Sequence, residues 1–233
     1  HYGDIVGVAG SNPAAPTIKI EKMRKSEKEI KKIFEEANKY TKDEDWKKSK
    51  DLWQELDELV PENHGIQYNL AQCFLRLGQY ESAKEKFLLA NKVAPLDINV
   101  HYGLGRTYEV ERDYDQAVKA YQKCLKIDKE HTNSLVRLAA VYRILKDPLS
   151  ALKLYKKLNE LHPKDINIAI DMSACVYEVG HIDTSISLLE GIMKKEPENK
   201  NVKKVLARIY HQIEDKKEEA IKLDKEVDGE ITF

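Results

Sequence analysis

Small and large apolar residues recur along the chain at a fixed interval. Four prolines, separated by 34, 68 and 34 residues, mark this interval: Pro61, Pro95, Pro163 and Pro197. Counted without gaps, it divides most of the chain into six blocks of 34 residues: 30–63, 64–97, 98–131, 132–165, 166–199 and 200–233. A constant period of this length indicates a repeat architecture in which each block is one structural unit.

Two positions of each block are always small. Position 8 holds Ala37, Ala71, Gly105, Ala139, Ser173 and Ala207. Position 20 holds Ser49, Ala83, Ala117, Ala151, Ser185 and, after a one-residue slip, Ala220. Large side chains occupy position 11 (Tyr40, Phe74, Tyr108, Tyr142, Val176, Tyr210) and position 24 (Trp53, Phe87, Tyr121, Tyr155, Leu189). Small residues would let two helices approach closely, and the large ones would fill the space beside that contact.

The spacing predicts two antiparallel helices in each block. Positions 4, 7, 8 and 11 share one face of a helix, and positions 20, 24 and 27 share another. A break is expected near position 15, where Gly78 and Gly180 stand, with helices of about 12 to 14 residues on either side. Asn63, Asp97 and Asn199 follow shortly after the prolines and are the expected N-caps of the next helices.

These columns resemble the tetratricopeptide repeat, a helix-turn-helix unit of the same length, and the resemblance covers residues 30–233. It implies an all-α fold, a right-handed α-solenoid or superhelix of antiparallel helix pairs with a concave inner surface. Five regular repeats would be followed by a divergent capping repeat, 200–233. The family implies a non-enzymatic scaffold that binds an extended or helical segment of a partner protein in its concave groove.

The residues before the repeats, 1–29, differ in character. Residues 1–19 contain three glycines, two prolines and no helical periodicity, so an extended arm is expected there. Residues 20–29 would lead into the first helix, with Ser26 and Glu29 spaced as a capping box. An alternative is that the arm folds back into the groove as an internal ligand.

The resemblance also places the inner wall of the groove on first-helix positions 2, 5, 9, 12 and 13. The candidate partner-binding residues at these positions are Tyr68, Gln72, Arg76, Asn99, Tyr102, Arg106, Asn133, Arg143, Tyr177 and Arg208. Cations outnumber anions on this wall by seven to two, and arginine suits bidentate recognition of carboxylates. The hypothesis is an acidic protein or peptide partner whose apolar side chains contact Tyr68 and Tyr102. The alternative is that these arginines are simply solvated.

Asparagine recurs at position 2 of four blocks, as Asn99, Asn133, Asn167 and Asn201. These amides could form a ladder that holds a peptide backbone. The alternative, which the sequence favours, is local, because an asparagine near a helix start can satisfy free backbone N–H groups.

Composition narrows the class of protein further. The 233 residues are 34% charged with a formal net charge of −1, and this balance argues against a nucleic-acid partner. No apolar run approaches the roughly 18 residues of a membrane span, so no transmembrane segment is expected. Cys73, Cys124 and Cys175 show no zinc or disulfide spacing and are expected to be free thiols in packing positions.

No motif for catalysis stands out. The seven histidines form no H-E-x-x-H pattern. Gly103-Leu104-Gly105 begins like a phosphate-binding loop but lies inside a predicted helix. The sequence therefore predicts no catalytic residue, no metal site and no cofactor, and it gives no oligomeric state.

The sequence is compatible with more than one cellular compartment. Free thiols suit a reducing compartment and favour the cytoplasm, while a signal or anchor removed upstream of His1 would place the chain in the bacterial periplasm or envelope. The alternative function is a structural subunit that assembles through its ends or convex face in a larger complex, at the bacterial envelope for example.

Overall fold

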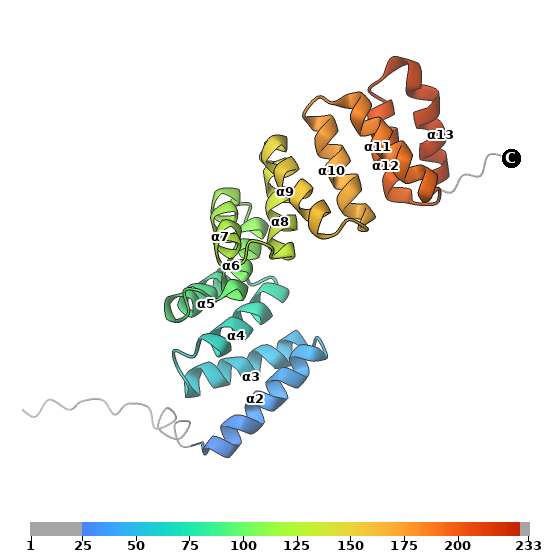
Figure 1. Cartoon of the computed structure of the whole chain (residues 1–233). Helices are drawn as coiled ribbons and strands as arrows, with labels where there is room; N and C mark the ends of the chain where they lie inside the picture. The colour runs from blue at the N-terminus through green and yellow to red at the C-terminus, as the bar shows by residue number, and fades with distance from the viewer. Residues whose placement is uncertain (1–24, 229–233) are drawn as a thin grey trace, which may run out of the picture. The chain divides into compact units, whose positions relative to one another are not determined.

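The computed structural model describes residues 25–228, so the arm expected over residues 1–19 lies outside the described part. The described residues form twelve α-helices and one short 3₁₀ helix, with no strand among them. The all-α prediction is therefore confirmed. The chain divides into two compact units, one ending at Ala94 and one beginning at Pro95. Figure 1 labels the helices of both units.

The first unit holds four helices, each packed against the next along the chain. They are α2 (Glu27–Lys42), α3 (Trp46–Leu59), α4 (His64–Arg76) and α5 (Tyr80–Val93). Trp53 and Leu56 of α3 form the centre of its core together with Leu70 of α4, and none of the three exposes more than 1% of its surface. The ring of Phe34 meets the Trp53 ring edge-on, with centroids 5.1 Å apart.

The second unit continues the same pattern of antiparallel pairs. Its helices are α6 (Ile98–Val110), α7 (Tyr114–Ile127), α8 (Thr132–Ile144), α9 (Pro148–Leu161), α10 (Ile166–Glu178), α11 (Ile182–Lys195), α12 (Lys200–Tyr210), the 3₁₀ helix η1 (Glu214–Lys216) and α13 (Lys217–Asp228). Each helix packs against its neighbours in the chain, and α10 also contacts α12. The first helices of the pairs, α6, α8, α10 and α12, thus form one layer and the second helices form the other.

The helix starts lie where the sequence predicts them. The side chains of Asn63, Asp97 and Asn199 each accept a hydrogen bond from a backbone N–H of the following helix. Ser26 and Glu29 form the expected capping box at the start of α2. Each such cap satisfies a donor that the first helical turn leaves unpaired and is worth about 1 kcal/mol.

The turn inside each of the first five helix pairs has a left-handed backbone at position 15. The dihedral φ is positive at Glu44, Gly78, Arg112, Lys146 and Gly180, which follow one another at the repeat interval. Glycine adopts this conformation freely, whereas a residue with a side chain pays roughly 1–2 kcal/mol. Helix packing therefore imposes the turn at Glu44, Arg112 and Lys146, and the glycines at the other two positions only make it easier.

The predicted small columns lie in the interior of the fold. All twelve residues at positions 8 and 20 are buried. Gly105 is tightly covered, because a Cβ added to it would lie 2.5 Å from Cε1 of Tyr121. The Tyr121 hydroxyl donates a 2.8 Å hydrogen bond to Glu109, which holds the ring across Gly105. Burial, followed by the nearby Glu109, raises the pKa of Tyr121, so the phenol keeps its proton and remains the donor.

Two glycine-to-alanine substitutions are expected to change stability in opposite directions. Gly105→Ala should lower the free energy of unfolding of the second unit by about 1–3 kcal/mol, because the fully buried Tyr121 ring must move. Gly191→Ala in α11 should raise it by up to about 1 kcal/mol, because nothing lies within 4 Å of the added Cβ. Urea unfolding followed by circular dichroism measures both, and equal shifts in one direction would contradict the packing described.

The three cysteines are buried free thiols, as the sequence predicts. Cys73 lies in α4, Cys124 in α7 and Cys175 in α10. Burial raises the pKa of each thiol, to about 12 for Cys175. They therefore stay protonated at neutral pH and act as small packing groups.

Candidate functional site

The first helices of the second unit are joined by polar contacts on one face. Nη1 of Arg137 in α8 lies 3.3 Å from a carboxylate oxygen of Glu109 in α6. Nδ2 of Asn201 in α12 lies 3.4 Å from Oδ1 of Asn167 in α10. Asn167, Asn201 and Glu109 occupy repeat positions 2 and 12 of the predicted inner wall, and Arg137 occupies position 6 beside it. We call the exposed and half-buried residues at positions 2, 5, 6, 9, 12 and 13 of α6, α8, α10 and α12 the first-helix face.

Tyr102 and Arg106 lie one helical turn apart on α6, and both are half-buried. The Tyr102 ring is supported by Tyr121 and by His131, with ring centroids 5.9 and 5.7 Å away. Arg106 makes no ion pair with any residue between 25 and 228. A fixed aromatic ring thus stands next to a guanidinium whose hydrogen-bond donors are available.

Arg143 is engaged within the chain. Its guanidinium donates to both carboxylate oxygens of Glu178 in α10, at 2.8 and 3.3 Å, and lies 3.7 Å from Asp171. The hydrogen bond with Glu178 raises the pKa of Arg143, and burial raises that of Asp171. Arg143 therefore ties α8 to α10, and a partner meets fewer open cations on this face than the sequence count suggests.

The asparagines at position 2 are not the caps of their helices. Asp97, Asp165 and Asn199 provide the caps, and the backbone N–H groups of Asn99, Asn167 and Asn201 donate to them. The local explanation favoured by the sequence is therefore wrong for these three residues, because the residue two positions earlier already satisfies the helix start. Their side chains are exposed, as is that of Asn133.

Three of the predicted site residues lie in the first unit. Tyr68 is half-buried against Phe87, with ring centroids 5.9 Å apart. Gln72 is half-buried one turn later, and Arg76 is exposed. The Arg76 guanidinium lies 5.3 Å from the centre of the Trp46 ring, a cation–π contact that orients it along the helix end.

The remaining two predicted residues lie toward the end of the second unit. Tyr177 is half-buried and packs against the core shared by α10, α11 and α12. Arg208 is exposed in the last turn of α12. Neither is brought next to Tyr102 or Arg106 by any contact described.

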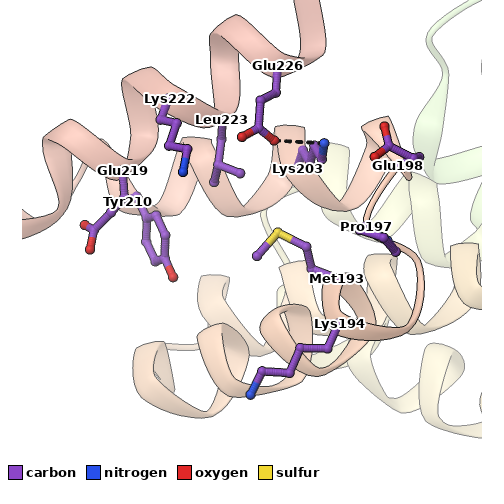
Figure 2. Close-up of a pocket in the computed structure, with 10 residues that line it drawn as sticks. All are labelled: Met193, Lys194, Pro197, Glu198, Lys203, Tyr210, Glu219, Lys222, Leu223 and Glu226. Carbon is purple, nitrogen blue, oxygen red and sulfur yellow. Dashed lines mark ion pairs between the residues drawn. The ribbon is translucent and has the colours of Figure 1, made fainter. Parts of the chain in front are cut away.

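Sequence reasoning missed a cavity of about 450 Å³ between α11, α12 and α13. Met193 of α11 and Leu223 of α13 point toward one another across it (Figure 2). At one end the buried Lys203 of α12 pairs with Glu226 of α13 at 2.8 Å. A lysine at position 4, on the buried face of a helix, is the signal that could have revealed this pair.

One pair of described residues has the spacing of a catalytic pair but is closed to substrate. Nδ1 of His131 lies 2.8 Å from Oγ of Ser134, which resembles a nucleophile and its base. Ser134, however, is fully buried, with 0% of its surface exposed, so no substrate can reach it. No group of three metal-ligating side chains gathers within residues 25–228. Over the same range, no helix combines the length and apolar content that a bilayer crossing requires.

Comparisons with known proteins identify the family. Sequence models of the tetratricopeptide repeat match residues 64–95, 98–131 and 142–209, together more than half of the chain. The chain belongs to the tetratricopeptide repeat family, whose members are typically non-enzymatic protein-interaction scaffolds. No curated protein matches it by sequence.

Solved structures confirm the fold. A tetratricopeptide repeat protein from Parabacteroides merdae superimposes with a TM-score of 0.77 at 16% identity, over 88% of this chain and 80% of that one. YrrB, described as a tetratricopeptide repeat protein with an unusual peptide-binding site, gives a TM-score of 0.62 at 20% identity, over 76% and 91%. MamA from Desulfovibrio magneticus gives 0.65 at 19%, over 73% and 95%. At such identities the likeness shows the fold alone.

Proposed function

We propose that the chain is a protein-interaction scaffold whose first-helix face binds an acidic, extended or helical segment of a partner protein. The observation that carries this proposal is the pair of Tyr102 and Arg106 on α6. The ring is held in place by Tyr121 and His131, so a partner's apolar side chain meets a surface that loses little entropy on binding.

Arg106 supplies the specificity. The neighbouring Arg137 and Arg143 are paired with Glu109 and Glu178, whereas Arg106 has no ion pair within the described residues. Its planar guanidinium can hold one carboxylate through two parallel hydrogen bonds. A segment with an apolar residue beside a carboxylate therefore fits this site. A peptide-binding site is also what YrrB is described as having, which supports a peptide partner for the same fold.

The test uses a fluorescent peptide of alternating leucine and glutamate, with glutamine in place of glutamate as its control. The full chain should bind the acidic peptide and not the neutral one, and raising salt from about 0.05 to about 0.3 M should weaken binding through screening. Arg106→Ala should weaken it about tenfold or more, because a hydrogen bond to a charged group is lost. Fluorescence anisotropy measures the affinity of each peptide at each salt concentration, for the wild type and for the variant.

Arg112→Asn is the matched control, since it removes an exposed arginine from a turn whose left-handed backbone asparagine tolerates. It should leave peptide binding unchanged. Equal binding of both peptides, or an Arg106→Ala variant as tight as the wild type, would refute the proposed site.

A second experiment uses a natural partner, identified by affinity purification and mass spectrometry. The double variant Tyr102→Ala/Arg106→Ala should no longer bind that partner.

A further inference from the structure

The second-helix layer of the second unit carries a group of lysines that the proposed function does not use. Lys119, Lys123 and Lys126 recur on α7 at the spacing of one helical face. Lys153 and Lys156 occupy the outward side of α9, and Lys153 stands one repeat after Lys119. All five are exposed. We call these five residues the lysine face.

The lysine face carries an excess of positive charge. None of its five members makes an ion pair within residues 25–228, and the carboxylates near it, Asp115, Asp147 and Glu160, stand at the ends of the two helices. The pKa of Asp147 is lowered by hydrogen bonds from Ser150 and also by the nearby Lys153. Some exposed lysines of other helices are paired locally, as in Lys48 with Asp45 at 2.9 Å and Lys217 with Glu214 at 2.6 Å. Like charges four residues apart on a helix destabilise it, so the lysine face lowers the stability of α7.

The two helices of the lysine face lie next to each other. Leu125 of α7 and Leu154 of α9 pack against the same buried cluster. The ammonium group of Lys157 in α9 also donates to the backbone carbonyl of Lys129, two residues past the end of α7. Figure 1 shows both helices beside α8 in consecutive pairs. The positive charge is thus spread in two dimensions, over about 10 Å along α7 and across to the neighbouring helix.

The residue types of the lysine face favour one kind of partner over the others. Protein interfaces are built around aromatic, apolar or arginine side chains and are depleted in lysine. Nucleic-acid sites that read bases or bind single strands add aromatic rings for stacking or arginines for base edges. The exposed residues of α7 and α9 include no aromatic ring and no arginine, and the exposed Ile127 and Leu149 lie at helix ends. A dense and laterally mobile array of anions, by contrast, needs only positive charge.

We propose that the lysine face docks the chain onto a membrane surface rich in anionic lipids. The ammonium groups contact headgroup phosphates without insertion of the protein into the bilayer, so binding is reversible and sensitive to salt. This inference goes beyond the proposed function, because the lysine face belongs to the second helices and the candidate peptide site to the first. Both sites can be occupied together, which would bring a bound partner to the membrane.

The direct test is sedimentation of the full chain with lipid vesicles. Vesicles of phosphatidylcholine containing about one third phosphatidylglycerol should carry the protein down at about 0.05 M salt, and about 0.3 M salt should release it. Vesicles of phosphatidylcholine alone should not bind. Binding to both kinds of vesicle, or to neither, would overturn the proposal.

A triple variant locates the binding face. Lys119→Ala/Lys123→Ala/Lys126→Ala should weaken vesicle binding about a hundredfold, since each lysine near an anionic surface contributes about fivefold. The matched control is Lys28→Ala/Lys32→Ala/Lys39→Ala on α2, which removes three exposed lysines that also lie along one side of a helix and lack ion pairs. The control should bind as the wild type does. Circular dichroism should show unchanged helix content in both, because all six side chains are exposed.

Three results would overturn the assignment. Equal weakening by the two triple variants would mean that total charge, not the lysine face, drives binding. Unchanged vesicle binding by the α7 variant would show that the membrane contacts another part of the chain. Binding of polyglutamate or of an RNA homopolymer, but not of anionic vesicles, would replace the membrane by an acidic protein or a nucleic acid.

Discussion

Ala117→Arg is expected to unfold much of the second unit. Ala117 exposes none of its surface and belongs to a cluster with Tyr121, Leu138 and Val141. Overpacking alone costs about 1–3 kcal/mol, and an unpaired buried charge adds several kcal/mol. The loss should therefore exceed about 3 kcal/mol, a large fraction of the stability of a domain.

Two optical signals distinguish unfolding of the first unit from unfolding of the second in this experiment. The chain's two tryptophans, Trp46 and Trp53, both lie in α3 of the first unit, while circular dichroism reports on all helices. For Ala117→Arg, the dichroism transition in urea should move to lower concentration and the tryptophan transition should stay in place. Lys123→Arg, on the exposed side of the same helix, should change neither. A dichroism curve that overlays the wild type would show that Ala117 is not a close contact.

Trp53→Ala should destabilise the first unit by about 3–5 kcal/mol, as deletion of a fully buried aromatic side chain does. The substitution removes the edge-on contact with Phe34 and leaves a cavity between α2 and α3. It also removes the 3.1 Å hydrogen bond from Trp53 Nε1 to Oγ1 of Thr41.

Trp46→Ala is the control for this prediction. Trp46 is only half-buried and packs at the edge of the same core, where its ring also faces the Arg76 guanidinium, so its loss should cost less. Thermal unfolding of the two variants, followed by circular dichroism and by the remaining tryptophan, gives the comparison. Equal destabilisation would contradict the central place of Trp53 in this core.

The helix pairs could be predicted from sequence because their determinants are local and repeated. A small residue at positions 8 and 20 is buried in every block, and the break at position 15 follows from the end of one helical pattern and the start of the next. The left-handed turn recurs even at Arg112 and Lys146, where no glycine announces it. The packing of the two helices in a repeat determines this turn. The repeat interval therefore predicted the position of the turn better than the type of residue there did.

The electrostatics of the candidate site could not be predicted in the same way. Repeat positions place Arg143 on the inner wall, but its pairing with Glu178 spans 35 residues and depends on how α8 and α10 approach each other. A count of charges by position treats Arg106 and Arg143 alike, although only Arg143 is neutralised. The prediction for the asparagines at position 2 was wrong for a related reason, because the residue two positions before each of three of them already caps the helix. Which of these residues contact a partner stays a prediction.

The buried thiols have a practical consequence. Cys73, Cys124 and Cys175 belong to three different helix pairs, and an alkylating reagent can reach each of them only when its own pair opens. Peptide mapping of the alkylated chain over time therefore yields a separate opening rate for each of the three pairs in the native protein, without any substitution or attached probe.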